Sequence, residues 1–250
     1  MRWSPRVLVV VEKQLREQMR SLLGPRWTIF GFEAFTVDGS RVQAPRTTAN
    51  EAAFGTGGRA NGMPQATLTT LLHMGSGVPY AYRVGPADGS ERHHQRTMMH
   101  RLAPGTLLVA DAGITGYDLL RDLIAESDSA AGAGGEGRHI LIRAGANVRL
   151  LQKLSYAVEE ENHTVYLWPG DVQRRGERPL TLRLIRVRID HRRSKRADGK
   201  KGKHKPSHVC LLTDLPASML SDAQARLIYR QRWDIEAFFR GLKQTTNQPR

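Results

Sequence analysis

The chain has 250 residues, and its 38 Lys and Arg against 24 Asp and Glu give a formal net charge of +14. Hydrophobic residues at 40% and charged residues at 25% exclude wholesale disorder, and no apolar run approaches the ~20 residues of a membrane span. A single cysteine, Cys210, excludes an internal disulfide and a cysteine-based zinc site, and it suits a reducing cytosol. We therefore expect a soluble, cytoplasmic protein that has no membrane contact and binds a polyanion, most often nucleic acid.

The first half of the chain mixes helices and strands. Turn residues such as Gly24-Pro25 and Gly75-Ser76-Gly77 separate its segments. In chain order, the predicted elements are a helix over Glu12–Leu23, a strand over Phe30–Val37, an irregular loop over residues 41–62, a hairpin of Ala66–Met74 and Val78–Val84, and a helix over Ser90–Leu102.

The second half is dominated by strands until its last segment. The predicted elements are a buried strand over Thr106–Ala110, a helix from Thr115 to about Ile124, a small-residue linker over Ser127–Gly137, strands over His139–Ala144, Thr164–Trp168, Leu180–Ile189 and Val209–Leu212, and a long helix from Ser218 to about Gln244. Strands and helices thus come first, a strand-rich block follows, and one helix closes the chain.

The closing helix carries an unusual polar stripe. Its members are Tyr229, Arg232, Glu236 and Lys243, which lie within ~60° of one another at ~100° per residue. Apolar side chains occupy the opposite side of the helix. The pattern is also that of a surface helix with a solvated charged face and an incidental ion pair four residues apart.

Two aspartates each follow an apolar segment and precede glycine or Ala-Gly. Asp38 and Asp111 are therefore either turn formers or carboxylates at the ends of strands, where α/β sheets place ligands. If both lie near Glu236, the three carboxylates repel one another unless divalent cations neutralise them. Oxygen ligands favour Mg²⁺ or Mn²⁺, and a pair of such ions can support phosphodiester cleavage.

These residues carry a resemblance to a known family. The spacing Tyr229-(2)-Arg232-(3)-Glu236-(6)-Lys243 resembles the Y-R-E-K signature of bacterial insertion-sequence transposases of the DDE type. The segments around Asp38 and Asp111 resemble the first and second aspartate blocks of that family. The separations of 73 residues from Asp38 to Asp111 and 125 from there to Glu236 leave room for the family's β-rich insertion.

The resemblance implies a fold and a reaction. The fold would be α/β, a ribonuclease-H-like mixed sheet flanked by helices, with the β-rich insertion before the last catalytic helix. Asp38, Asp111 and Glu236 would be the catalytic residues and would bind two Mg²⁺ or Mn²⁺ ions, with Asp38 bridging them. The reaction would be cleavage and strand transfer at transposon ends, with double-stranded DNA as partner (transposon ends and target) and a homodimer in the DNA complex. The protein would associate with the nucleoid when bound to DNA.

The resemblance also implies DNA contacts, and side-chain chemistry supports several of them. Tyr229, Arg232 and Lys243 would bind phosphates, and Trp233 would either stack on an unpaired base or pack as an ordinary, partly buried tryptophan. A basic arm over residues 191–206 would contact the DNA backbone or serve as a solvated loop. Its basic residues are Arg192, Arg193, Lys195, Arg196, Lys200, Lys201, Lys203 and Lys205.

The predicted organisation has four parts: a lead-in over residues 1–27, the first part of the core over 28–126, the linker and insertion over 127–217, and the closing helix over 218–250. Compared with the family, both ends look short, so we expect a truncated copy whose complete transposition is impaired. The alternative is a non-catalytic, basic DNA-binding remnant of a transposase. A general RNA-binding protein would leave the carboxylates without a role.

Overall fold

The computed structural model describes residues 5–58, 62–99, 101–112, 116–131, 138–145, 156–159, 162–188 and 208–246. Its helices are α1 (Pro5–Leu23), the 3₁₀ helix η1 (Gly24–Trp27), α2 (Thr48–Phe54), α3 (Glu91–Met99), α4 (Tyr117–Ala131), α6 (Gly170–Arg174), α7 (Asp222–Gln231) and α8 (Asp234–Thr245). Its strands are β1 (Glu33–Gln43), β2 (Gln65–His73), β3 (Val78–Pro86), β4 (Thr106–Ala110), β5 (His139–Gly145), β6 (Tyr156–Glu159), β7 (Thr164–Leu167), β8 (Leu180–Arg188) and β9 (His208–Thr213).

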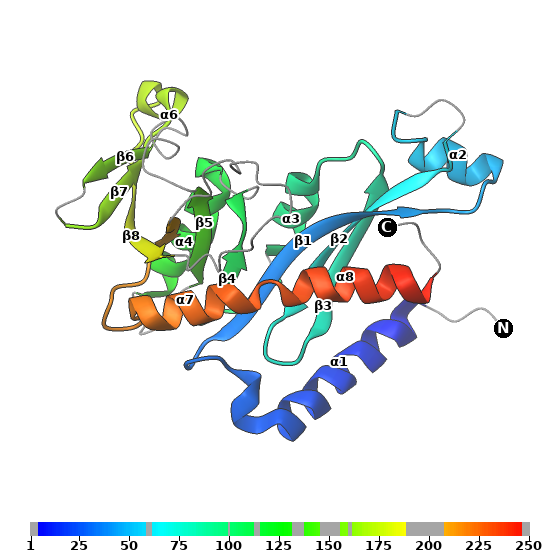
Figure 1. Ribbon diagram of the computed structural model, residues 1–250, viewed down its shortest axis with the longest axis horizontal. Coiled ribbons are helices and arrows are strands. Elements are labelled where there is room, and N and C mark those ends of the chain that lie inside the picture. Colours follow the sequence, from blue (N-terminus) through cyan, green and yellow to red (C-terminus); the bar gives the residue numbers. More distant parts are fainter. Residues whose placement is uncertain are drawn as a thin grey trace, which may run out of the picture.

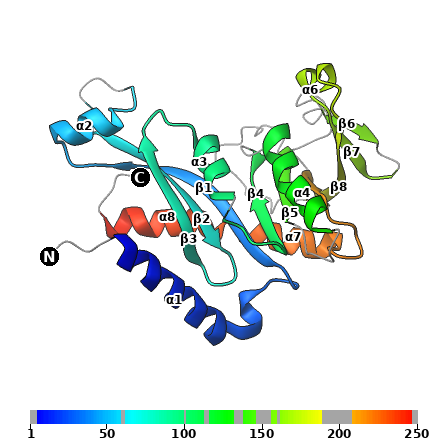
Figure 2. The ribbon, with the colours of Figure 1, turned by 180° about the vertical axis from the view of Figure 1, so that it is seen from behind.

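The strands of the described part form one mixed sheet in the order β3-β2-β1-β4-β5-β9-β8-β7-β6. Strands β1, β2 and β3 form an antiparallel meander, and β4 and β5 add to β1 in parallel. Helices cover both faces: α7 and α8 lie on one, and α3 and α4 on the other (Figures 1 and 2). The mixed α/β sheet flanked by helices, which the resemblance predicted, is confirmed.

Alternating side chains of the strands divide the core between these two faces. Phe35 and Leu108 pack in the cluster that includes residues of α3 and α4, whereas Ala34 and Val109 pack in the cluster that includes residues of α7. Because successive residues of a strand point to opposite faces, Asp38 and Asp111 point to the face that α7 and α8 cover. Burial of the apolar positions thus fixes the face on which both aspartates lie.

Two predictions for residues 30–62 were wrong. The strand does not end before Asp38; β1 continues to Gln43, because its second half pairs with β2 from Asp38↔Thr70 to Gln43↔Gln65. The segment predicted as an irregular loop also contains helix α2, which begins with Thr47 as its N-cap. The hairpin predicted from its glycine turn is confirmed as β2 and β3.

The strands of the predicted insertion extend the core sheet. Strand β9 pairs antiparallel with β5, and β8, β7 and β6 follow outward in antiparallel order. Helix α4 continues to Ala131, so the stretch predicted as a linker from Ser127 begins inside a helix. None of the described helices is long and apolar enough to cross a membrane.

Candidate active site

Three neighbouring strands bring polar side chains to one level of the sheet. The β1–β4 register ends at Thr36↔Val109, so two residues further on Asp38 lies level with Asp111. The β4–β5 register ends at Ala110↔Ile142, so the next level joins Asp111 to Arg143. All three side chains share the face that α7 and α8 cover, because side chains alternate along a strand. An Arg143 Nη1–Asp111 Oδ1 distance of 3.9 Å confirms the second contact.

The two aspartates have the same local geometry. Asp38 Oδ1 accepts a hydrogen bond from the Gly39 N–H at 2.8 Å, and Asp111 Oδ1 accepts one from the Ala112 N–H at 2.7 Å. Burial raises the pKa of Asp38 above its usual value, and the charge of Asp111 raises it further; the Gly39 N–H and Arg232 oppose both effects. Burial and the neighbouring carboxylate thus make the negative charge of Asp38 costly.

The closing segment is two helices, so the prediction of one long helix was wrong. Helix α7 begins with a capping box between Ser221 and Gln224, and α8 begins after Trp233. Between them the chain makes i→i+3 hydrogen bonds, from the Arg232 N–H to the Tyr229 carbonyl at 3.2 Å and from the Ile235 N–H to the Arg232 carbonyl at 3.3 Å. Arg232 and Trp233 thus lie between the two helices.

Arg232 lies at this break and links the carboxylates. Its side chain is only 3% exposed, and its Nη2 lies 3.5 Å from Asp111 Oδ2 and 3.4 Å from Glu236 Oε1. Its Nε is buried and has no hydrogen-bond partner among the described residues. The alternative of a solvated charged face is therefore wrong for Arg232, which is a buried cation between two half-exposed acids.

The two aromatic residues beside Arg232 differ in exposure. Tyr229 is half-buried, and its pKa is raised first by burial and then by the charge of Asp111. Trp233 is 55% exposed, with the Arg232 guanidinium carbon 5.4 Å from its ring centroid. The indole of Trp233 is therefore accessible to a ligand.

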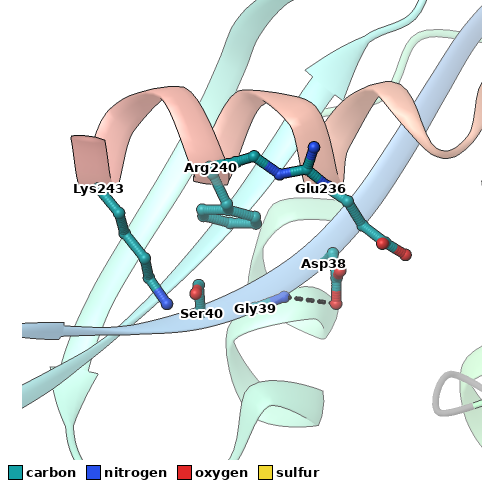
Figure 3. A pocket seen from close by; sticks show the side chains of 7 residues that line it. Asp38, Gly39, Ser40, Glu236, Arg240 and Lys243 are labelled. Atoms are coloured by element: carbon teal, nitrogen blue, oxygen red, sulfur yellow. Dashed lines mark hydrogen bonds between the residues drawn. The ribbon is translucent and has the colours of Figure 1, made fainter. Parts of the chain in front are cut away.

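Glu236 and Asp38 line one pocket between α8 and β1, with a volume of about 310 Å³. Figure 3 shows Lys243 reaching from α8 toward Ser40 on β1, with Asp38 and Glu236 at the other end. The complete lining is Asp38, Gly39, Ser40, Glu236, Phe239, Arg240 and Lys243. The three predicted carboxylates thus meet around one place: Asp38 and Asp111 by strand register, Asp38 and Glu236 in the pocket, and Asp111 and Glu236 through Arg232.

The donor chemistry of this place fits a hard divalent cation. The donors are carboxylate oxygens, which Mg²⁺ and Mn²⁺ prefer, and Arg232 already places a positive charge between two of them. Within the described ranges, no three His, Cys, Asp or Glu side chains lie close enough together to hold an ion as they stand. Metal binding therefore requires the carboxylates to move closer together and the Arg232 side chain to move away from them.

Three polar residues of the site were not predicted from the sequence. Ser40 could have been found from its position two residues after Asp38, on the same face of the strand. Arg240 could have been found from its position four residues after Glu236, one helical turn along. Arg143 had no such signal, because only the register of β4 and β5 places it beside Asp111.

The basic arm lies outside the described residues. This applies to all eight of its predicted DNA contacts, Arg192, Arg193, Lys195, Arg196, Lys200, Lys201, Lys203 and Lys205.

Comparison with known proteins identifies the family of this chain. The sequence profile of the transposase DDE domain matches residues 30–250, which include all three carboxylates. The chain belongs to this family. Transposase DDE domains are enzymes, and they use divalent metal ions.

One curated transposase and one solved structure are similar to this chain. The transposase InsG for insertion sequence element IS4 of Escherichia coli (strain K12) is 27% identical over 242 residues, covering 90% of this chain and 47% of the relative. The chain therefore spans about half the length of this curated relative. A cryo-EM structure of the piggyBac transposase synaptic complex with hairpin DNA aligns with a TM-score of 0.44 and 11% identity, over 91% of this chain and 47% of the other.

Proposed function

We propose that this chain is the catalytic domain of an insertion-sequence transposase that cleaves DNA at transposon ends and transfers the cut strand to a target. The observation that carries the proposal is the meeting of Asp38, Asp111 and Glu236 on one face of the sheet around Arg232. A carboxylate cluster that needs cations, inside a strongly basic chain, suits metal-dependent chemistry on a polyanion.

Each side chain has a proposed role. Asp38, Asp111 and Glu236 would hold two Mg²⁺ or Mn²⁺ ions, and the bound ions would activate the attacking oxygen and stabilise the leaving oxygen. Arg232 and Lys243 would bind phosphate oxygens, the first as a fork of donors and the second as a point charge.

The aromatic residues and the basic arm would complete the DNA interface. Tyr229 would donate its hydroxyl to a phosphate, and the exposed indole of Trp233 would stack on an unpaired base. The arm of residues 191–206 would add affinity that does not depend on base sequence, so serine in place of its Lys and Arg residues should flatten the salt dependence of DNA binding. An unchanged dependence of DNA affinity on salt concentration would show that the arm does not contact DNA phosphates.

One observation favours a second candidate, a non-catalytic DNA-binding remnant. The acids of the described part are not clustered tightly enough to hold an ion, and Arg232 neutralises two of them. A protein that only binds DNA would not need to hold a metal ion, so its carboxylates could remain paired with Arg232. The two candidates differ in whether the DNA is cut.

The deciding experiment is cleavage of supercoiled plasmid DNA in Mg²⁺ or Mn²⁺ by wild type and by Glu236→Gln. The matched control is Asp234→Asn, the same loss of a carboxylate on an exposed residue two positions away on α8. We expect nicking by wild type and by the Asp234 variant, and a loss of at least 100-fold in the Glu236 variant, about 2.7 kcal/mol of barrier. Equal products from wild type and the Glu236 variant would eliminate the catalytic proposal. A homodimer in the DNA complex stays a prediction.

A further inference from the structure

Arg183 of β8 joins the strand-rich insertion to the segment that leads into α7. Its side chain lies on the same face of β8 as that of Ile185, which packs in the cluster that includes residues of α7. The guanidinium donates three hydrogen bonds: Nε to the Leu215 carbonyl at 3.0 Å, Nη2 to the Leu220 carbonyl, and Nη1 to Asp222 Oδ1 at 2.6 Å. One side chain thus holds both ends of the link between β9 and α7.

The three acceptors suit the planar fork of an arginine. Leu215 and Leu220 are buried, so their carbonyls are costly to leave without a donor. Asp222 adds a charge-assisted hydrogen bond. The side chain of Arg183 is itself only 18% exposed. A lysine would bring a point charge in place of the fixed fork of donors. Arg183 is therefore built into the scaffold and is not displayed to a ligand.

Strand β8 is in turn fixed to the core. It pairs with β9, and β9 pairs with β5 (Figure 1). Just before β8, the Tyr117 hydroxyl of α4 donates a hydrogen bond to the Arg178 carbonyl at 2.6 Å. Arg121 of α4 also lies 2.7 Å from Glu177, as an ion pair. The insertion thus contacts α4 on one face of the sheet and holds the beginning of α7 on the other.

The packing of α7 leaves its direction to these polar contacts. Within α7, which the structure describes completely, the buried residues are Ala225 and Ile228. This is a small apolar contact for a helix about 15 Å long. Arginines hold the two ends of the helix: Arg183 at the beginning, and Arg232, which contacts the carboxylates, at the end. Glu236 follows four residues after Arg232, so its position relative to the two aspartates depends on where α7 lies on the sheet.

We propose that Arg183 is a positioning residue for Glu236. By fixing the beginning of α7, it sets where the Glu236 carboxylate meets the two aspartates. The strand-rich insertion is then part of the scaffold of the site, in addition to any contact that it makes with DNA. The inference rests on the proposed catalytic role of Glu236. A displacement of about 1 Å at a reacting group can cost about 100-fold in rate, so Arg183 can control the reaction without touching the DNA.

The test compares wild type with Arg183→Met and Arg183→Lys in amide hydrogen exchange and in plasmid nicking with Mg²⁺. Both variants lose the three-way contact, so exchange in residues 222–246 should become about 10-fold faster, whereas β1 and β4 should keep their wild-type rates. The kcat of nicking should fall about 10- to 100-fold with KM for the plasmid within about 2-fold, because Arg183 holds Glu236 and not the DNA. The control is Arg174→Met, an exposed arginine of α6 in the same insertion, which should match wild type.

An arginine that only stabilises the fold would give a different pattern. Exchange would then rise in all strands together, or kcat would fall no further than the unfolded fraction in urea titrations accounts for. Either result would overturn the proposal, as would equal exchange in residues 222–246 for Arg183→Met and Arg174→Met.

Two outcomes shift the decision to another measurement. If neither Arg183 variant folds, Asp222→Asn removes only the charged acceptor and should speed exchange in residues 222–246 about 3-fold; an unchanged rate there would overturn the proposal. If wild type cuts no plasmid, the cleavage proposal fails, and the exchange pattern alone decides whether Arg183 positions α7 and the Glu236 that follows it.

Discussion

Lowering the pH from 7 to 4.5 is expected to destabilise the protein through His73, at the end of β2. The side chain is 2% exposed and stacks on Trp27, with 3.9 Å between ring centroids. Its Nδ1 accepts a hydrogen bond from the Ser76 N–H at 3.1 Å. Burial lowers the pKa of His73 from 6.5 to about 4, because the imidazolium would lose its hydration.

The sign and size of the effect follow from proton linkage. Between pH 6.5 and 4 the unfolded chain protonates His73 and the folded protein does not, so acid favours unfolding. A proton bound only by the unfolded state costs about 1.4 kcal/mol per pH unit. Between pH 7 and pH 4.5 the contribution of His73 to the free energy of unfolding therefore falls by about 2.5 kcal/mol. Below pH 4 the folded protein also binds the proton, and the loss levels off.

The assay is urea unfolding at steps from pH 7 to pH 4.5, on wild type, His73→Gln and His93→Gln. Carboxylates contribute to the pH dependence of all three proteins. The quantity compared is therefore the slope of the free energy of unfolding against pH, taken as the difference between each variant and wild type. His73→Gln should reduce this slope by the equivalent of about one bound proton, about 1.4 kcal/mol per pH unit. His93→Gln, at an exposed position of α3, should leave the slope unchanged. Parallel curves for wild type and the His73 variant would refute a buried, neutral imidazole.

Three further predictions concern the site and its scaffold. Arg232→Met should tighten Mn²⁺ binding by about 5- to 10-fold in titration calorimetry, because a competing cation near the carboxylates costs about 1 kcal/mol even in a high dielectric; weaker binding would mean that the arginine organises the ligands. Gly75→Ala should destabilise the protein by about 1–3 kcal/mol, because the new Cβ would lie 2.6 Å from a backbone oxygen of η1. Gly39→Ala meets only the mobile end of the Glu91 side chain and should cost less than about 0.5 kcal/mol, so equal losses for the two glycines would contradict the packing argument. Ser221→Ala should lower the unfolding free energy by about 1 kcal/mol through loss of the capping box, with Ser218→Ala as an exposed control that should have no effect.

Local patterns predicted the elements that local chemistry determines. The glycine turn located the β2–β3 hairpin, and a continuous apolar run located β4, which ends just before Asp111 as expected. Asp38-Gly39 was misleading, because aspartate before glycine usually marks a turn. Here nine residues of β2 pair with β1 across that position, and these long-range hydrogen bonds outweigh the local preference.

The closing segment shows a second limit of sequence patterns. The helical period correctly grouped Arg232 with Glu236, which form an ion pair four residues apart. It did not reveal the break between α7 and α8, which lies where Arg232 turns inward to Asp111. A buried contact between residues 121 positions apart depends on how the helices dock on the sheet, and no local window contains that information.

The placement of β9 beside β5 has a consequence for how this fold can vary. After β5 the chain forms β6, β7 and β8 at the outer part of the sheet and returns on β9, which pairs with β5 with Leu141 level with Thr213, before it enters α7. Because β5 and β9 are neighbouring strands, the two ends of the segment between them lie close together. Its ends stay in place whatever its length, and lengthening a loop costs only about 0.6 kcal/mol per doubling. The segment between β5 and β9 can therefore vary in length while β5 and β9 stay paired, but β8 has to remain, because Arg183 of β8 donates hydrogen bonds to the carbonyls of Leu215 and Leu220 just before α7.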